Sequence, residues 1–396
     1  MPEKQKVLLV HNFYQIGGGE HTVYQNEKRL LQENGHEVIT YTRSNDELKA
    51  SFVKKMLLPF TTVFSIKTYR EVKSIIKKEK IEIVHCHNTF PLISPSVYYA
   101  AWRCKVPVIQ TVHNFRFLCP CGVFYHDGKI CEDCVHQGLK MAIKNKCYRG
   151  SSLQTAVVVN MLKIHRWLGT YQKLHYIFLT EFNREKFRTL IGPKVANEFV
   201  KPNFEYIDAV AGSNSAIEKD KFVFAARLDE NKGVRFLLEA WKQQKNRRLI
   251  VFGNGPLENV VREAAKQNPM IEYRGFCDQN QIFSELKTAE SFLFTSNLYE
   301  TFGMTLIESL ALGVPVLCSD IGNPADIVSN AHAGICYHEG DMVDFLRKLD
   351  KISDDIINKE LRENALMAYR KNYTPEVNYG MLKNIYDKVC RENVKG

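Results

Sequence analysis

Residues 300–308 read ETFGMTLIE and place Glu300 and Glu308 eight positions apart, with Gly303 between them. They follow the apolar run 291–296, SFLFTS, which has the length and composition of a buried strand. A helix that begins near Gly303 puts Glu308 just over one turn inside it and leaves Glu300 on the preceding loop. One carboxylate can then bind sugar hydroxyls and the other ribose hydroxyls, with a helix N-terminus between them for phosphate. Such a spacing also arises by chance, so the rest of the chain has to support this interpretation.

Strand-like apolar runs alternate with amphipathic helical stretches on both sides of this segment. The alternation predicts parallel sheets with helices on both faces, and the same order of elements is laid down twice. We therefore predict an α/β fold of two doubly wound domains, with ligands bound in a cleft at the carboxyl ends of the strands. The expected strands are KVLLV, HEVITYT, IEIVHCH and PVIQTVH in the first half, and KFVFAARL, RRLIVFG, MIEYRGF, SFLFTS and VPVLCSD in the second.

A chain of 396 residues exceeds what one hydrophobic core usually organises. We predict an N-terminal domain over 1–200, with an insertion at about 115–150, and a C-terminal domain over 221–375. Residues 201–220 are rich in Pro, Gly, Ser and Asn and lack periodicity, which predicts a linker. Residues 376–396 are predicted to form a helix that crosses back to the N-terminal domain.

The composition is that of a globular protein, with 45% hydrophobic and 25% charged residues. Only a short apolar run, KVLLV, lies near the N-terminus, and it fits a strand better than the core of a signal peptide. No apolar run has the length of a membrane-spanning helix. We therefore expect a cytoplasmic protein.

The net charge of +10 is unevenly spread along the chain. Residues 1–200 carry 29 Lys+Arg and 16 Asp+Glu, a balance of +13, whereas 201–396 carry 25 and 28, a balance of −3. This asymmetry predicts an anionic partner for the first half. A nucleic acid is the less favoured partner because no recognised binding motif accompanies the charge.

Two strand ends of the first half carry candidate binding residues. Gly17, Gly18 and Gly19 follow the first strand and open a helix, where backbone N–H groups can approach a phosphate. The triplet lacks the spaced third glycine of the dinucleotide-binding pattern, and a plain tight turn is the alternative. His113 follows the strand PVIQTV, where it can bind hydroxyl groups or move protons. A histidine without a functional role is the alternative there.

Two further strand ends carry candidates in the second half. Arg227 and Lys232 follow the strand KFVFAA, just before a helix, and two fixed cations there suit a diphosphate. Taken singly, each could be an ordinary surface charge. Gly253 and Gly255 follow RRLIVF in another turn where backbone can approach a nucleotide. The ordered agreement of these turns across both domains favours a ligand site over chance.

With these motifs the chain resembles the retaining glycosyltransferases of family 4, which have the two-domain GT-B fold. The resemblance covers essentially the whole chain. It is strongest in Ala226-Arg227-Leu228 with Asn231-Lys232-Gly233, which is similar to the arginine–lysine pair of that family. Residues 300–308 match its E-x7-E motif and are followed by SLALGVPV.

The resemblance implies roles for individual residues. Arg227 and Lys232 would bind the donor diphosphate and stabilise the leaving group, Glu300 would contact the donor sugar, and Glu308 the ribose. His113 would lie near the reacting sugar, although Asn114 stands where the family often has an acid and Thr301 where glycine is common. The implied catalytic residues are His113, Arg227, Lys232 and Glu300. The implied donor-binding residues are Gly18, Gly19, Arg227, Lys232, Gly253, Gly255, Glu300, Gly303, Met304, Thr305 and Glu308.

The resemblance further implies transfer of a hexosyl group from a nucleotide diphosphate-sugar to a glycan or lipid-linked acceptor, with retention, in bacterial surface polysaccharide synthesis. No Asp-x-Asp motif stands at a strand end, so no cofactor is expected for catalysis and the cations would take the place of a metal. Two alternatives stay open: a sugar-nucleotide 2-epimerase of the same fold, and a non-catalytic nucleotide-sugar-binding module. The sugar, the base, the acceptor and the linkage are not predicted.

Residues 49–80 mix Lys and Arg with Phe, Leu, Val and Ile. That composition suits docking on an anionic membrane surface that carries a lipid-linked acceptor, which would place the protein on the inner face of the cell membrane. An ordinary helix pair packed on the sheet is the alternative.

A cysteine-rich segment follows His113. Cys131 and Cys134 have the spacing of one half of a zinc site, and Cys147 is a third candidate ligand. Similar family members carry a Cys-Pro-x-Gly segment, which favours Cys119 over Cys121 as the fourth. A structural zinc ion is the favoured prediction. Free thiols and a disulfide are the alternatives, and the disulfide is the least expected in the cytoplasm.

Overall fold

The computed structural model describes residues 4–15, 18–48, 52–191, 197–207 and 216–395, and it divides into two compact units. Unit 1 comprises residues 1–124, 131–203 and 375–396, and unit 2 comprises 125–130 and 204–374. Gly17 of the predicted glycine turn and residues 208–215 of the predicted linker lie outside the described residues.

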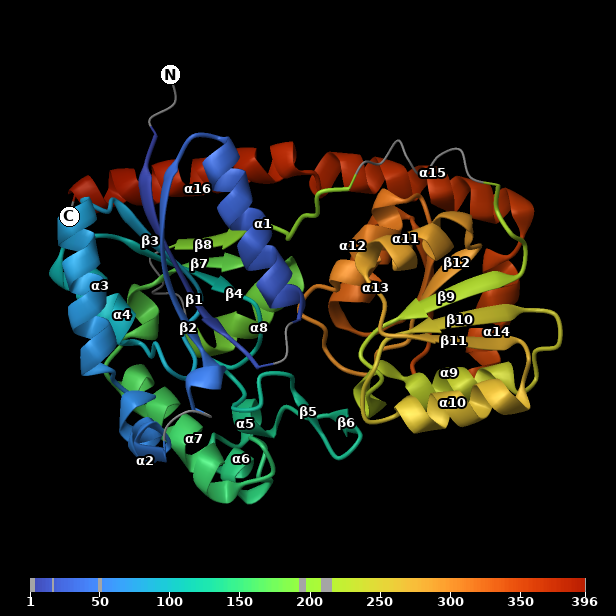
Figure 1. Cartoon of the computed structure of the whole chain (residues 1–396), viewed down its shortest axis with the longest axis horizontal. Coiled ribbons are helices and arrows are strands. Elements are labelled where there is room, and N and C mark those ends of the chain that lie inside the picture. Colours follow the sequence, from blue (N-terminus) through green and yellow to red (C-terminus); the bar gives the residue numbers. More distant parts are fainter. Residues whose placement is uncertain (1–3, 16–17, 49–51, 192–196, 208–215, 396) are drawn as a thin grey trace. The chain divides into compact units, whose positions relative to one another are not determined.

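Unit 1 is built on a parallel sheet with the strand order β2-β1-β3-β4-β7-β8 (Figure 1). Its central strands are buried from end to end, as expected where helices cover both faces. The elements of the unit are β1 (Lys6–Phe13), α1 (Gly19–Glu33), β2 (Glu37–Ser44), η1 (Asn45–Leu48), α2 (Phe52–Thr61), α3 (Ile66–Glu79), β3 (Ile83–Asn88), α4 (Ser96–Arg103), β4 (Val108–Val112), α5 (Asp133–His136), α6 (Lys140–Lys144), α7 (Ser152–Trp167), η2 (Tyr171–Lys173), β7 (His175–Phe178), α8 (Glu181–Ile191), β8 (Asn197–Val200) and α16 (Pro375–Lys395).

The last helix, α16, belongs to the core of unit 1. Leu382, Tyr386 and Val389 on one of its faces are buried with Val7 of β1 and Leu31 of α1. The spacing of these three residues along α16 gives one apolar stripe, which explains why the helix packs on the sheet. The chain thus returns to unit 1 after completing unit 2 (Figure 1).

Unit 2 repeats the doubly wound plan, with the strand order β11-β10-β9-β12-β13-β14 and parallel pairing throughout. The hairpin of β5 (Tyr125–His126) and β6 (Lys129–Ile130) groups with it. The remaining elements are β9 (Lys221–Ala225), η5 (Glu230–Lys232), α9 (Val234–Trp241), β10 (Arg248–Phe252), α10 (Glu258–Gln267), β11 (Ile271–Gly275), α11 (Gln279–Thr288), β12 (Ser291–Phe294), α12 (Met304–Ala311), β13 (Val316–Ser319), α13 (Gly322–Ala331), β14 (Gly334–Tyr337), α14 (Met342–Ile352) and α15 (Asp355–Asn372).

The α/β fold of two doubly wound domains is confirmed, and one local prediction needs correction. The predicted linker 201–220 begins with buried chain, because Lys201 and Asn203 are 1% and 4% exposed within unit 1 and Phe204 is buried in unit 2. Lys201 is buried because it is ion-paired with Glu27. The cysteine-rich segment contains the helices α5 and α6 and the β5–β6 hairpin.

Candidate active site

The best-defined polar arrangement of unit 2 is an ion pair between Lys232 and Glu300. Lys232 ends η5, which follows β9, and Glu300 lies on the loop between β12 and α12. The Lys232 ammonium donates to the Glu300 carboxylate, which also accepts from the Ser296 hydroxyl at 2.7 Å. Both side chains are partly exposed, at 24% and 15%. A ligand entering here therefore meets one cation and one carboxylate in fixed positions.

The two loops that carry this pair are held together at backbone level. Gly233 has a φ of +70°, and a Cβ built there would lie 2.0 Å from the carbonyl oxygen of Thr295. The Thr295 hydroxyl donates to the carbonyl of Lys232 at 2.9 Å, and the N–H of Asn297 donates to the carbonyl of Asn231 at 3.1 Å. Only glycine allows this approach. The position of Lys232 is therefore fixed by a neighbouring strand end.

Glu300 is held from its backbone as well. The Asn323 side-chain amide donates to the carbonyl oxygens of Glu300 at 2.5 Å and of Thr301 at 3.0 Å. Asn323 is fully buried in the first turn of α13. Asn323 was not predicted, and it lies too far along the chain for the pattern around residue 300 to indicate it.

Arg227 and the two glycines Gly253 and Gly255 lie together at the ends of β9 and β10. The Arg227 side chain is 51% exposed and pairs with Asp229 at 3.3 Å. A Cβ on Gly253 would lie 1.9 Å from the Ala226 carbonyl oxygen, and one on Gly255 2.5 Å from the Leu228 carbonyl oxygen. Glycine is thus required at both positions because the backbone carbonyls of Ala226 and Leu228 lie too close for a side chain. Their predicted contact with a donor stays a prediction.

Helix α12 begins immediately after the loop of Glu300. Gly303 is its N-cap, with a φ of +98°, and Met304 and Thr305 follow in the first turn. The first N–H groups of a helix have no partner within it and carry partial positive charge, so they can bind phosphate or hydroxyl oxygens. The predicted helix start at Gly303 is confirmed.

Glu308 lies on α12 and is buried, at 8% exposure. Its Oε1 accepts a hydrogen bond from Gln279 at 2.9 Å. Burial, together with the nearby Glu205 carboxylate, raises the pKa of Glu308 to about 7. Glu205 and Gln279 were missed from the sequence because they come from other segments of unit 2.

In unit 1, Gly18 and Gly19 stand at the start of α1. Gly18 is extended, with a φ of −149°, and a Cβ built there would meet nothing within 4 Å. No described part of the chain thus explains a glycine at this position sterically, and a ligand can approach it closely. Burial raises the pKa of the adjacent Glu20 to about 8. Asn114 donates to Glu20 Oε2 at 3.5 Å, which explains why an amide fits where the family often has an acid.

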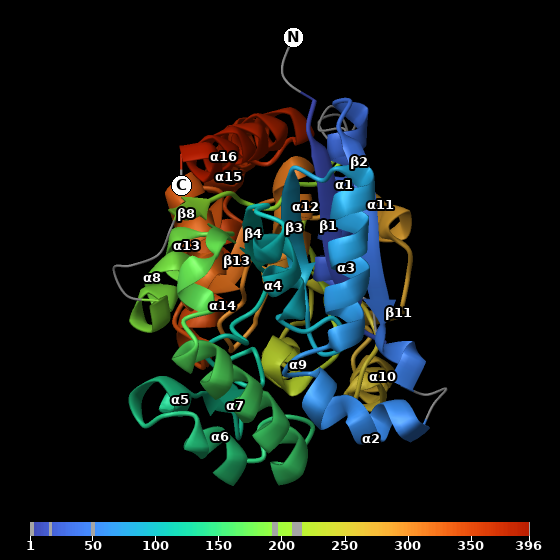
Figure 2. The same ribbon diagram turned by 90° about the vertical axis from the view of Figure 1, so that its left-hand side faces the viewer.

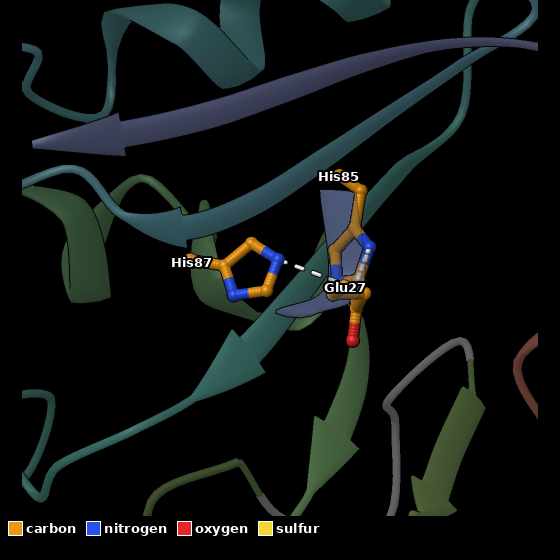
Figure 3. A group of neighbouring side chains, drawn as sticks. All are labelled: Glu27, His85 and His87. Atoms are coloured by element: carbon orange, nitrogen blue, oxygen red, sulfur yellow. Dashed lines mark ion pairs between the residues drawn. The ribbon is translucent and has the colours of Figure 1, made fainter. Parts of the chain in front are cut away.

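His113 follows β4 and belongs to a buried histidine cluster. Its Nε2 lies 2.9 Å from Nδ1 of His87, and the two rings stack at a centroid distance of 5.1 Å. His87 and His85 both face Glu27 on α1 (Figure 3). Of these residues, His113 alone was predicted from the sequence. The alternating histidines in IEIVHCH were the signal for the others.

The cysteine set predicted to bind zinc is only partly gathered. Sγ of Cys119 lies 3.2 Å from Sγ of Cys121, and the Cys119 side chain also forms a hydrogen bond with Cys134. The contact with Cys121 lowers the pKa of Cys119, but the Cys134 contact and burial raise it to about 11. Among the described residues, Cys119, Cys131, Cys134 and Cys147 do not form a group of ligand atoms within 4.8 Å of one another, whereas Glu27, His85 and His87 do. The zinc site stays a prediction.

Two doubly wound parallel units, with a cation–carboxylate pair beside a helix N-terminus at the strand ends of the second, have the architecture of the GT-B fold. Two family models match the chain: Glycosyltransferase Family 4 over residues 16–132 and Glycosyl transferases group 1 over residues 209–368. The protein belongs to this glycosyltransferase family.

Relatives with known sequences support the same class. The chain is 24% identical over 362 residues to 2-deoxystreptamine N-acetyl-D-glucosaminyltransferase of Niallia circulans, covering 86% of this chain and 87% of the relative. It is 23% identical over 397 residues to alpha-monoglucosyldiacylglycerol synthase of Streptococcus pneumoniae, covering 93% and 83%.

Solved structures show the same fold. A glycosyltransferase from Rickettsia africae superposes with a TM-score of 0.70 at 16% identity, covering 98% of both chains. HepE of Anabaena, solved in complex with UDP, superposes with a TM-score of 0.64 at 14% identity, covering 97% of this chain and 100% of HepE.

Proposed function

We propose that this glycosyltransferase moves a hexosyl group from a nucleotide diphosphate-sugar to a glycan or lipid-linked acceptor, in the synthesis of a bacterial surface polysaccharide or glycolipid. The observation that supports this proposal most strongly is the Lys232–Glu300 ion pair beside the N-terminus of α12. A cation there offsets negative charge on a departing diphosphate, and a fixed carboxylate accepts hydrogen bonds from sugar hydroxyls. The UDP bound to HepE and the glycolipid named for the pneumococcal relative support the donor and acceptor classes.

Each residue of the proposed donor site has a distinct task. Arg227 and Lys232 stabilise the leaving diphosphate, and the N–H groups of Gly303, Met304 and Thr305 bind its oxygens or the sugar. Glu300 orients the sugar, and Glu308 accepts hydrogen bonds from the ribose. In unit 1, Gly18 and Gly19 approach the donor phosphate and His113 the sugar. The reaction proceeds with retention, and the two cations supply the electrostatic stabilisation for which other enzymes use a metal ion.

A donor screen separates this proposal from a 2-epimerase and from a binding module. The purified protein is incubated with a panel of nucleotide-sugars, with and without a lipid extract, and free nucleoside diphosphate is measured. Transfer releases the diphosphate in an acceptor-dependent manner, epimerisation yields a new sugar without an acceptor, and a binding module releases nothing.

The stereochemistry and the metal requirement need two further measurements. The anomeric configuration of the product is read by NMR, and retention is expected. Activity in excess chelator should remain at the untreated level, and its loss with recovery on adding a divalent ion would refute metal independence.

We also propose that unit 1 docks on an anionic membrane surface through a patch formed by α2, the following turn and α7, here called the α2–α7 patch. Phe60 on α2 is 75% exposed, and Leu153 and Trp167 on α7 are 82% and 84% exposed. His165 of α7 bonds to the Val63 carbonyl at 2.9 Å, so the end of α7 lies beside the turn after α2 (Figure 2). Exposed apolar side chains on a basic unit suit insertion among anionic headgroups.

The neighbouring helix α3 shows the alternative arrangement. Its Val72 and Ile76 are buried, as in an ordinary helix packed on a sheet. The docking surface is therefore limited to α2 and α7 and does not extend over the whole of 49–80.

Flotation with vesicles tests the α2–α7 patch. Wild type should bind vesicles containing anionic lipid more tightly than neutral ones, and Phe60→Ser with Trp167→Ser should remove most of that binding. Phe276→Ser is the matched control, because Phe276 is 78% exposed in unit 2. Equal binding by the patch variant and the control would refute the docking surface.

A further inference from the structure

Two cysteines of unit 2 stand side by side on neighbouring strands. Cys318 of β13 and Cys336 of β14 are partners in the parallel register, and β14 is an edge strand of its sheet. Register partners in a parallel pair point to the same face of the sheet, and these two sulfur atoms lie 3.6 Å apart. The pair is separate from the cysteine-rich segment and has no task in the proposed donor site.

The backbone allows the two sulfur atoms to be joined. Neighbouring strands run about 4.8 Å apart, and disulfides connect Cα atoms that are about 4.4–6.8 Å apart. The sulfur atoms of a disulfide lie about 2 Å from each other, so the present 3.6 Å has to close by side-chain rotation and a small shift of the edge strand. The fold does not have to rearrange for this bond to form.

The two thiols differ in access and in acidity. Cys318 is fully buried, whereas Cys336 is partly exposed. The contact with Cys318 and the Ser329 hydroxyl, 3.5 Å away on α13, outweigh burial and lower the pKa of Cys336 to about 7. The contact with Cys336 and burial raise the pKa of Cys318. A dissolved oxidant therefore meets the more acidic thiol first, and the thiolate is the form that reacts.

Cys318 lies next to a group that supports the loop of Glu300. Ser319 follows Cys318 on β13, and its hydroxyl donates to the carbonyl of Ser296 at 2.6 Å. The Ser296 hydroxyl in turn donates to the Glu300 carboxylate at 2.7 Å. A shift of β13 at Cys318 is therefore transmitted to Glu300 through two hydrogen bonds.

Cys336 packs against the helix that holds Glu300 from the other side. Its Sγ lies 3.5 Å from the Ser329 hydroxyl and 3.9 Å from the carbonyl oxygen of Ala325, both on α13. The first turn of the same helix carries Asn323, whose amide donates to the carbonyl of Glu300. When Cys336 turns toward β13, it leaves its contacts with α13.

We propose that Cys318 and Cys336 are an oxidation site, which a peroxide closes to a disulfide and which thereby slows donor turnover through the loop of Glu300. The Cys336 thiolate attacks one peroxide oxygen and breaks the O–O bond, which gives a sulfenic acid and a hydroxide ion. The hydroxide takes up the proton that Cys336 had released. The Cys318 sulfur then attacks the sulfenic sulfur, the S–O bond breaks, and the leaving oxygen departs as water with the proton of Cys318.

The two thiols together lose two electrons, and one peroxide molecule is reduced to two molecules of water. The bond formed is reversible, because a dithiol reductant regenerates both thiols by exchange. The effect on turnover rests on the proposed function, whereas the formation of the disulfide does not.

A metal site and a pair of inert thiols are the competing interpretations. In the part of the chain that the structure describes, no third His, Cys, Asp or Glu ligand atom lies within 4.8 Å of both sulfur atoms. Structural metal sites need about four ligands, so this pair lacks the ligand set. Inert thiols are distinguished by experiment.

Peptide mapping of the full-length protein tests the disulfide. The reduced protein is freed of reductant and exposed to hydrogen peroxide, and its remaining thiols are blocked before digestion after Asp and Glu. Asp320 and Asp326 lie between the two cysteines, so mass spectrometry should find peptides 309–320 and 327–339 joined in most chains. Unlinked peptides after peroxide treatment would show that the thiols are inert and would overturn the proposal.

Single variants test the order of the two steps. Cys318→Ser should leave Cys336 as a sulfenic acid that dimedone traps. Cys336→Ser should give no dimedone adduct on Cys318, because that thiol is fully buried. Cys318→Ala is the second variant if serine in the buried position lowers the melting temperature. Equal trapping in the two positions would contradict the role of Cys336 as the attacking thiol.

Turnover is measured on the same samples with the donor found in the screen. In the linked wild type kcat should fall about tenfold, since a displacement of about 1 Å in a catalytic group can cost up to about 100-fold, and dithiothreitol should restore it. Cys336→Ser should keep its activity in peroxide, whereas Cys277→Ser, the control outside the pair, should respond as wild type does.

Two outcomes separate this inference from the proposed function. Unchanged turnover in the linked protein would refute the coupling to Glu300. If the disulfide forms but neither redox form transfers sugar from any donor, the oxidation site stands and the proposed function fails.

Discussion

Lys232 and Glu300 are ion-paired although 68 residues separate them, and the glycine that follows Lys232 is what allows their loops to meet. The pair is preorganised, because the Ser296 hydroxyl and the Asn323 amide hold the loop of Glu300 from two sides. Groups fixed in advance lose little energy to reorganisation when charge develops on a substrate.

Replacing Lys232 by methionine should lower kcat for sugar transfer by about 100-fold, because a preorganised charge at the leaving group is lost. Lys242→Met is the matched control, since Lys242 is 67% exposed near the end of α9. Initial rates of nucleoside diphosphate release give the comparison, and melting temperatures show whether the fold is retained. Equal rates in the two variants would remove Lys232 from the catalytic residues.

Glu308 should make stability depend on pH. Its folded pKa of about 7 exceeds the ordinary value of 4.5, so the folded protein binds more protons than the unfolded chain between these values. The free energy of unfolding should therefore fall as pH rises through this window, by about 3 kcal/mol at most. Urea unfolding at pH 5 and pH 8 should show Glu308→Gln equal to wild type at pH 5 and more stable at pH 8. The exposed Glu263→Gln should show no such difference.

Gly253→Ala should destabilise unit 2 by about 2 kcal/mol or more, because the backbone conformation is strained for alanine and the methyl group meets the Ala226 carbonyl. Gly340 also has a positive φ, but a Cβ there would meet nothing within 4 Å. Gly340→Ala should therefore cost only the backbone strain of an alanine at positive φ, about 1 kcal/mol. Chemical denaturation of both variants measures the difference. If the two substitutions destabilise the protein equally, the Ala226 carbonyl does not restrict the side chain at residue 253.

Gly18→Ala should cost at most about 1 kcal/mol of stability, the difference between glycine and alanine at a helix N-cap, since residue 18 is extended and its Cβ would point into open space. If a donor phosphate approaches this backbone, the methyl group should also raise the donor KM several-fold. Saturation kinetics with the donor found in the screen provide the measurement. An unchanged KM would favour a plain turn at the start of α1.

Zinc analysis of the purified protein should find about one ion per chain if the cysteine-rich segment binds metal. Cys131→Ser should then lose the ion and lower the melting temperature, whereas Cys277→Ser in unit 2 should retain it. Burial raises the pKa of Cys131, so without a metal its thiol stays protonated at neutral pH. If the purified wild-type protein contains no zinc, the cysteines of this segment are free thiols.

The fold, and the position of Arg227, Lys232 and Glu300 on loops after strands of unit 2, could be predicted because their signals are local. Strand ends followed by Arg227, Lys232 and residues 300–308 are continuous patterns, and parallel sheets bring strand ends to one edge. The sequence does not show that the Cα atoms of Gly253 and Gly255 face the chain itself, so this second reason for glycine could not be predicted. Their contact with a donor stays a prediction. The buried contacts of Glu27 with His87 and Lys201 were missed because these residues come from three distant segments.

Lys201 illustrates the limit most clearly. In the sequence it begins a stretch with the composition of a linker, and nothing near it marks it as buried. Only the fold brings it to Glu27, where the ion pair makes burial of both charges tolerable.

The return of α16 to unit 1 affects how the protein is made. Tyr386 of α16 lies 2.7 Å from His85 of β3, and Leu382 and Val389 fill the core beside β1. A ribosome therefore has to synthesise all of unit 2 before the first unit can close its core. Until then the nascent N-terminal half exposes apolar surface to chaperones and proteases. A premature stop codon within unit 2 would therefore leave both units with incomplete cores.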